Sequence, residues 1–219
     1  MSLTVLLKDE LRGFYRSKVM LFLWVGLPAL VLIMHLYMPD TDEIPLTTFS
    51  SLIIASLAGT LGAVMLAVSI VNEKGRRVYD LFLIRPIRRR DIVLSKFLAV
   101  YLCLVAAGVL ALLVGIGYDV GVNGTPSAEV LDSAVESLSV SLAMMAVSSA
   151  VGVLIGIASP SVVVAAILVI YGGGQISTMT MVPSIMGWEN EAAMTVLIGA
   201  VLASALMALS ILAFDRKQF

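Results

Sequence analysis

Residues 72–96, NEKGRRVYDLFLIRPIRRRDIVLSK, decide how this 219-residue chain is arranged, because they place a strongly basic segment between two long apolar runs. The run before it, Phe49–Val71, and the run after it, Phe97–Tyr118, contain no Asp, Glu, Lys or Arg. A helix of roughly 20 mostly apolar residues crosses a bilayer core about 30 Å thick. Both runs are therefore predicted to be transmembrane helices, joined by a segment too polar to enter the membrane.

Four further runs have the same character. The whole chain is 60% hydrophobic and 13% charged, whereas a soluble domain carries about 25% charged residues. The sequence therefore predicts an all-α integral membrane protein, a single transmembrane domain over residues 1–219. Its six predicted spans are Val19–Tyr37, Phe49–Val71, Phe97–Tyr118, Leu138–Ala158, Val162–Met179 and Ala192–Phe214.

The charges are sorted by segment. All fourteen Lys and Arg residues precede the first run, lie within 72–96, or follow the last run, while the alternate segments carry only acids. Cytoplasmic loops close to spans accumulate Lys and Arg. This pattern predicts that both ends of the chain and segment 72–96 lie in the cytoplasm.

Residues 2–18 form a short amphipathic segment ahead of the first span. Leu3, Leu6, Leu7, Leu11 and Phe14 follow helical spacing, and charged residues occupy the other side. We expect an elbow helix in the inner interface, with its apolar face in lipid and its bases near anionic headgroups. A cytoplasmic extension of the first span is the alternative.

Two glycine patterns stand out in the second half of the chain. Gly152 and Gly156 form a small-xxx-small pair, which is typical of close helix packing in membranes. Gly172–Gly174 interrupt the fifth run, and Pro183 and Gly187 follow. Residues 171–188 are either a broken or re-entrant outer segment, or an outer loop that begins where the fifth span ends at the glycines.

The sequence offers little support for catalysis. It contains no His, Cys and carboxylate cluster at metal-ligand spacing, no Gly-x-Ser-x-Gly turn and no Gly-x-x-x-x-Gly-Lys-Ser/Thr phosphate loop. His35 and Cys103 are the only residues of their types. Because no ionisable residue lies in the middle of a predicted span, we expect energy for active transport to come from outside the chain.

Segment 72–96 has the features of a docking element. Val78, Leu81 and Phe82 give a short helix an apolar face, and Pro86 disfavours a helical conformation at Arg85, which forces a turn. The turn presents the polar residues 88–91 and is predicted to bind a protein partner. Anchoring at anionic headgroups is the alternative for the bases.

The same segment resembles the loop between the second and third spans of type-2 ABC exporter permeases. Residues that match the family's pattern in order are Glu73, Gly75, Asp80-Leu81, Pro86-Ile87, Arg89 and Lys96. Two positions depart from it: Gly75 lies farther from Pro86 than usual, and Arg85 replaces the frequent Thr. The resemblance extends to the six spans, the amphipathic N-terminal segment and the irregular segment before the sixth span.

The resemblance implies a mechanism and partners. Such permeases pair as homodimers or heterodimers in a cell membrane, here a prokaryotic plasma membrane, and bind two ATPase subunits that carry ATP and Mg²⁺. This chain would itself hold no cofactor, and its partners would include lipids but no nucleic acid. The residues expected to couple to the ATPase are Glu73, Asp80, Leu81, Phe82, Pro86, Arg88, Arg89, Arg90 and Asp91.

The resemblance also implies a substrate route along the dimer interface. The polar candidates for its lining are Ser56, Thr60, Gln175, Ser177 and Thr178. Hydrogen bonding between helices is the alternative role for these side chains. Two other functions are kept as rivals to the permease: a membrane scaffold or assembly factor, and a lipid-modifying enzyme, for which Glu73, Asp80 and Asp91 are too scattered.

Overall fold

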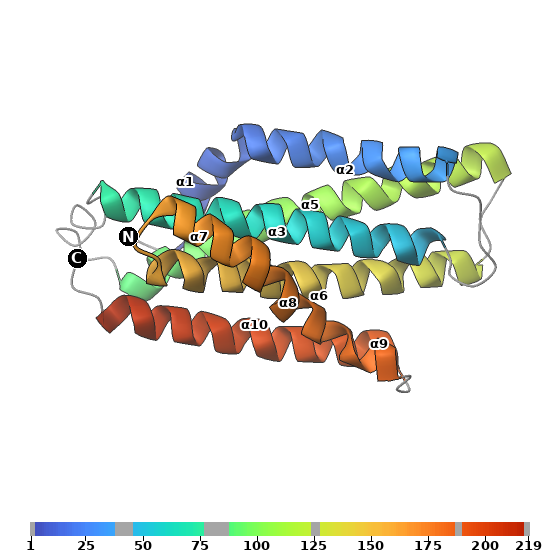
Figure 1. Ribbon diagram of the computed structural model, residues 1–219. Coiled ribbons are helices and arrows are strands. Elements are labelled where there is room, and N and C mark those ends of the chain that lie inside the picture. The colour runs from blue at the N-terminus through green and yellow to red at the C-terminus, as the bar shows by residue number, and fades with distance from the viewer. Residues whose placement is uncertain (1–2, 38–45, 77–87, 124–127, 187–189, 217–219) are drawn as a thin grey trace.

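The computed structural model describes residues 3–37, 46–76, 88–123, 128–186 and 190–216 as a bundle of long helices (Figure 1). Every element in these ranges is helical, which confirms the all-α prediction. The long helices are α2 (Lys18–Tyr37), α3 (Leu46–Gly75), α5 (Arg89–Asn123), α6 (Ala128–Ala158) and α10 (Glu191–Arg216). The shorter elements are α1 (Leu3–Tyr15), α7 (Val162–Leu168), the π-helix η1 (Val169–Gly173), α8 (Gly174–Thr178), the 3₁₀-helix η2 (Met179–Met181) and α9 (Val182–Met186).

The number of helices that can cross a membrane is five or six within the described ranges. Five are long and apolar enough on their own: α3, α5, α6, the stretch Val162–Met181 and α10. The sixth is α2, which meets the same criteria together with α1, although the two helices are bent by 67° relative to each other. The protein is thus a multi-pass membrane protein.

Helix α6 lies at the centre of the bundle and packs closely against α3 and α10. A Cβ atom on Gly152 would lie 2.5 Å from the carbonyl oxygen of Ala63, and one on Gly156 would lie 2.9 Å from Cα of Ala67. On α10, a Cβ atom on Gly199 would lie 2.8 Å from Cβ of Ala143. The predicted packing role of Gly152 and Gly156 is confirmed, because only the absence of a side chain allows this approach.

The chain stays helical through the glycines of the fifth run. From Val162 to Met186 the helix type changes from α to π, back to α, then to 3₁₀ and again to α. Figure 1 shows this path leaving the line of α7 and turning along α10. The interpretation that the fifth span simply ends at Gly172 is wrong, because residues on both sides of the glycines continue the helical backbone.

Helix α1 packs on the protein rather than lying free in lipid. Leu6 and Phe14 are buried in the main hydrophobic core, and Leu7 and Leu11 pack against it. The expectation that this apolar face points into lipid is therefore wrong: α5 offers it a protein surface that the sequence does not reveal. The position of α1 at a membrane interface stays a prediction.

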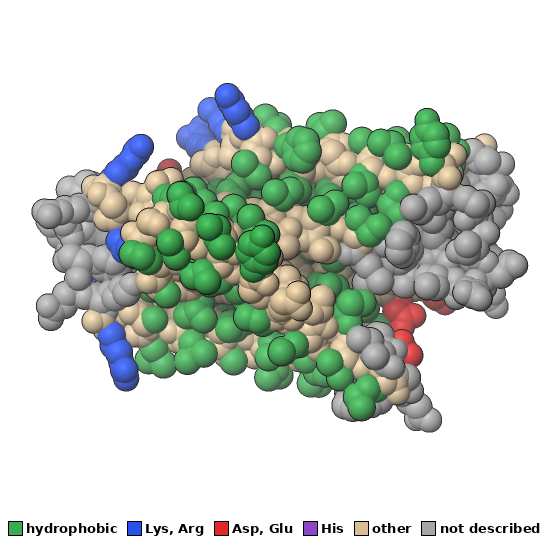
Figure 2. Space-filling view, in the orientation of Figure 1, with side chains coloured by type: hydrophobic (Ala, Val, Ile, Leu, Met, Phe, Trp, Pro, Cys, Tyr) green, Lys and Arg blue, Asp and Glu red, His purple; other side chains and the backbone are tan. Residues whose placement is uncertain are grey.

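The two ends of the bundle differ in charge. On the face seen in Figure 2, the Lys and Arg side chains gather at the end where α3 finishes, and the large acidic patch lies at the opposite end. The beginning of α1 and the end of α10 lie at that same basic end (Figure 1). The side of the membrane on which this end lies stays a prediction.

Candidate functional site

The candidate site lies at the basic end of the bundle, where α3 ends and α5 begins. These two helix ends flank residues 77–87, and the adjoining residues 72–76 and 88–96 are within the described part of the chain. Lys96 stands two turns into α5 and is only 2% exposed. A buried ammonium in a membrane protein needs charged or polar partners, because an isolated charge is costly to remove from water.

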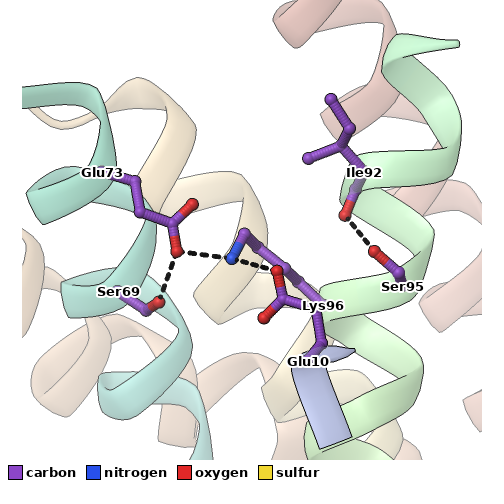
Figure 3. Close-up of polar contacts among 6 residues, drawn as sticks. All are labelled: Glu10, Ser69, Glu73, Ile92, Ser95 and Lys96. Carbon is purple, nitrogen blue, oxygen red and sulfur yellow. Dashed lines mark hydrogen bonds and ion pairs between the residues drawn. The ribbon is translucent and has the colours of Figure 1, made fainter. Parts of the chain in front are cut away.

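The first partner of Lys96 is Glu73, near the end of α3. Lys96 Nζ lies 2.5 Å from Glu73 Oε1, and Ser69 Oγ donates to the same oxygen at 3.1 Å. Ser69 is one turn before Glu73 on α3, so it fixes the carboxylate in place. Figure 3 shows the carboxylate turned from α3 toward α5. The second oxygen, Glu73 Oε2, is buried and has no hydrogen-bond partner among the described residues.

The second partner of Lys96 comes from α1. Lys96 Nζ donates to Glu10 Oε1 at 2.7 Å, and it also lies 6.0 Å from the centre of the Phe14 ring. One ammonium thus joins α1, α3 and α5 (Figure 3). Lys96 is 86 positions from Glu10 and 23 positions from Glu73 in the sequence. We call Glu10, Glu73 and Lys96 the ionic triad.

The arginines at the start of α5 have different surroundings. Arg89 Nη1 donates to the carbonyl oxygens of Phe214 at 3.4 Å and Asp215 at 3.2 Å, which lie at the end of α10. Arg90 pairs with its neighbour Asp91 at 3.6 Å, and its side chain is 55% exposed. Arg88 is exposed. Arg89 therefore ties α5 to α10, while Arg88 and Arg90 present charge to the surface.

Lys74 makes a comparable contact with the central helix. Its ammonium donates to the carbonyl oxygens of Ile157 at 3.4 Å and Ser159 at 2.5 Å. Ile157 is in the last turn of α6, where carbonyl groups lack partners within the helix and a cation is favourable. The ends of α3 and α6 are thus joined at the basic end of the bundle.

The predicted coupling residues are only partly described by the structure. Asp80, Leu81, Phe82 and Pro86 lie outside the described residues. Of those described, Glu73 faces the inside of the bundle, Arg89 faces α10, and Arg88 and Arg90 are exposed with Asp91 beside them. Their role in docking an ATPase stays a prediction.

The five predicted substrate-route residues fall on two elements, α3 and α8. Ser56, Gln175 and Thr178 are exposed, Thr60 is half-buried and Ser177 is buried. The hydroxyl groups of Thr60, Ser177 and Thr178 each donate to a carbonyl oxygen three or four residues earlier in the same helix, at 2.8–3.1 Å. The expected alternative, hydrogen bonds between helices, is not what these hydroxyl groups make in the described contacts.

The chemistry of the site is electrostatic and mechanical. Within the described ranges no group of three or more His, Cys, Asp or Glu side chains is placed to hold a metal ion. What the triad does provide is a rigid connection, because a buried ion pair resists separation of its partners.

Sequence reasoning missed Glu10 and the inward position of Lys96. From the sequence, Lys96 is predicted only as a base of segment 72–96 and a match to the family pattern, and Glu10 is given no role. The available signal was spacing: Glu10 lies one turn before Phe14, whose apolar spacing with Leu3, Leu6, Leu7 and Leu11 predicted a buried face. A carboxylate at the edge of such a face needs a cation on the element that covers it.

Comparison with known proteins assigns most of the chain to one family. Residues 6–175 match the family described as ABC-2 family transporter protein. The match includes all three members of the ionic triad and both helix ends that flank residues 77–87. A search of the curated proteins found no match to the chain.

Proposed function

The chain belongs to the ABC-2 family of transporter proteins, and from this premise we propose that it is the membrane-spanning permease subunit of an ATP-driven exporter. In this proposal ATP and Mg²⁺ bind to two separate ATPase subunits, and two permease copies, or one copy and a paralogue, form the pore. The chain converts movement of its loop into movement of its helices and carries out no hydrolysis itself. The membrane is the cell membrane, a prokaryotic plasma membrane.

The ionic triad is the observation that supports this function. A partner that pulls on residues 77–87 acts on the end of α3 and the beginning of α5, and Lys96 holds both to α1. Arg89 and Lys74 extend these connections to α10 and α6. A loop whose two ends are tied to three other helices, α1, α6 and α10, can transmit force, whereas a loop that only anchors to headgroups has no need of such contacts.

The charge distribution supports the orientation that this function requires. The exposed bases Lys8, Arg12, Arg16, Arg76, Arg88, Arg90 and Arg216 belong to segments that flank one end of the bundle. Because cytoplasmic ends of spans are rich in Lys and Arg, we propose that this end faces the cytoplasm, where an ATPase has access to ATP. In the same proposal α1 is the elbow helix at the inner interface.

The substrate route is proposed along α3 and the α7–α9 path. The exposed Ser56, Gln175 and Thr178 are its candidate contacts, together with the half-buried Thr60. The π-helix η1 immediately precedes α8, and such insertions are frequent at functional sites because they loosen the regular backbone ladder.

A direct test is association with the ATPase. The tagged full-length chain, purified in mild detergent from its native membranes, is expected to bring down an ATP-hydrolysing partner whose activity depends on Mg²⁺. The double variant Arg88→Glu/Arg90→Glu should lose that partner, because the exposed positive charges that would contact it are reversed. Arg216→Glu, a reversal on α10 at the same end of the bundle, is the matched control. Retention of the partner by the double variant would exclude these arginines from docking.

A further inference from the structure

A cavity of about 380 Å³, largely open to the surface, lies where α1, α2 and α5 meet, apart from the ionic triad. Its size falls within the range of about 300–1,000 Å³ that is typical of ligand sites. Most of its lining is hydrocarbon or aromatic ring. The lining residues are Leu11, Arg12 and Tyr15 of α1, Trp24 of α2, and Leu102, Cys103 and Ala106 of α5.

One basic residue, Arg12, lines this cavity, and further bases are close to it in sequence. Arg12 lines it and is exposed, Lys8 lies one helical turn earlier, and Arg16 and Lys18 lie at the bend between α1 and α2. Figure 2 shows a group of Lys and Arg side chains over this bend, directly beside apolar side chains. Asp9 is exposed on the same helix, and Glu10 is turned away toward Lys96. Three bases and a fourth at the start of α2 thus outweigh the one exposed acid.

Tyr15 supplies an amphipathic rim between the bases and the hydrocarbon lining. Its ring packs edge to face on Trp24, with centroids 5.4 Å apart, and its side chain is 53% exposed. Tyrosine and tryptophan are enriched where hydrocarbon meets headgroups, since their rings sit in the apolar layer and their polar atoms face water. The groups along the cavity therefore match the parts of a phospholipid in order: a basic side chain beside the headgroup, an aromatic rim at the interface and an apolar lining along the acyl chain.

We propose that this cavity binds an anionic phospholipid, with one acyl chain between α1, α2 and α5 and the phosphate held by Arg12. Charge complementarity selects this occupant over a neutral lipid, because juxtamembrane bases attract anionic headgroups. The apolar interior selects it over a free anion, which would gain nothing from Leu11, Trp24 or Leu102. The site is independent of the proposed ATPase partner.

Trp24 provides a probe inside the site. The chain has two tryptophans, so the variant Trp188→Phe leaves Trp24 as the only indole. The full chain in this background, held in detergent micelles, is titrated with phosphatidylglycerol whose acyl chains carry bromine, a contact quencher of indole fluorescence. Phosphatidylcholine with the same brominated chains is the matched lipid. We expect saturable quenching by the anionic lipid at lower concentrations than by the neutral lipid.

Two variants locate the lipid within the cavity. Arg12→Gln should weaken the apparent affinity for the anionic lipid about fivefold and leave the neutral lipid unchanged, whereas Arg216→Gln on α10 should change neither. Ala106→Phe, which fills the cavity from α5, should abolish saturable quenching while thermal unfolding confirms that the variant is folded.

The proposal is overturned by any of three results. Equal quenching by the two lipids would show that headgroup charge is not recognised. Full protection by glycerol phosphate, which has no acyl chains, would show a simple anion site. Saturable quenching that survives in a folded Ala106→Phe protein would place the lipid outside this cavity.

Discussion

The ammonium of Lys96 lies 2.5 Å from Glu73 Oε1, although the two residues stand on opposite sides of residues 77–87. The contact closes the loop at its base, so the two helices that carry it cannot separate without breaking a buried ion pair. Glu10 adds α1 to the same ammonium at 2.7 Å. Three elements that are far apart in sequence therefore share one charged centre.

Replacing Lys96 by Met should destabilise the folded protein by about 3 kcal/mol, because two carboxylates lose the cation that offsets their burial. The side chains of Glu10 and Glu73 are 22% and 23% exposed, so water relieves part of the cost. Thermal unfolding in detergent measures the change.

A double-mutant cycle separates the Lys96–Glu73 contact from general damage. Lys96→Met combined with Glu73→Gln should cost less than the sum of the single changes, with a coupling energy of roughly 0.5–3 kcal/mol. Strict additivity would mean that the two groups do not interact in the folded protein.

The long helices could be predicted from the sequence because every helix that crosses a bilayer needs about 20 mostly apolar residues. Each of the five helices that qualify on their own contains one of the predicted apolar runs. The beginning of α5 could not be predicted from the apolar run alone, since polar residues such as Arg89 and Asp91 continue the helix beyond it. The backbone path of residues 162–186 could not be predicted either. Glycines permit both a break and a continued helix, and packing decides between them.

Gly152→Ala should destabilise the bundle by about 1–3 kcal/mol, because the new methyl group would meet the backbone of Ala63, which cannot rotate away. Gly62→Ala should cost less, since the nearest atom is Leu104 Cδ1 at 2.7 Å, the end of a flexible side chain. Gly117→Ala is the control. Nothing described lies within 4 Å of its Cβ position, so replacing a helical glycine there should be neutral or stabilising. Equal effects at all three positions in thermal unfolding would contradict close packing of α3 on α6.

Lys74→Met should cost about 1–2 kcal/mol in unfolding free energy, since the carbonyl oxygens of Ile157 and Ser159 lose a charged donor at the end of α6. Arg76→Met, two residues later and exposed, should change stability by less than about 0.5 kcal/mol. Hydrogen exchange at the end of α6 gives a local measurement. Faster exchange there in Lys74→Met alone would agree with the capping contact, and equal exchange in both variants would not.

The candidate site could be predicted only in outline. Segment 72–96 stands out by its bases, and the structure places its described parts, residues 72–76 and 88–96, at the basic end of the bundle. The direction of each side chain was not predictable. Lys96 and Arg88 are both bases near the same span, yet one is buried and the other exposed, since only the partners that α1 and α3 bring to Lys96 decide between the two.

Arg89 and Arg90 are adjacent in sequence, and the structure predicts that their loss has different consequences. Arg89 donates to the last carbonyl groups of α10, so Arg89→Gln should lower the unfolding free energy by about 1–2 kcal/mol. Among the described residues Arg90 pairs with Asp91 at the surface, so Arg90→Gln should change stability by less than about 0.5 kcal/mol. If the exposed arginines dock an ATPase, the order reverses for association: Arg90→Gln should weaken co-purification of the ATPase more than Arg89→Gln does. Thermal unfolding and co-purification measured on the same two proteins test both halves. An Arg90→Gln protein that is less stable than Arg89→Gln would show that the contact between α5 and α10 contributes little to the bundle.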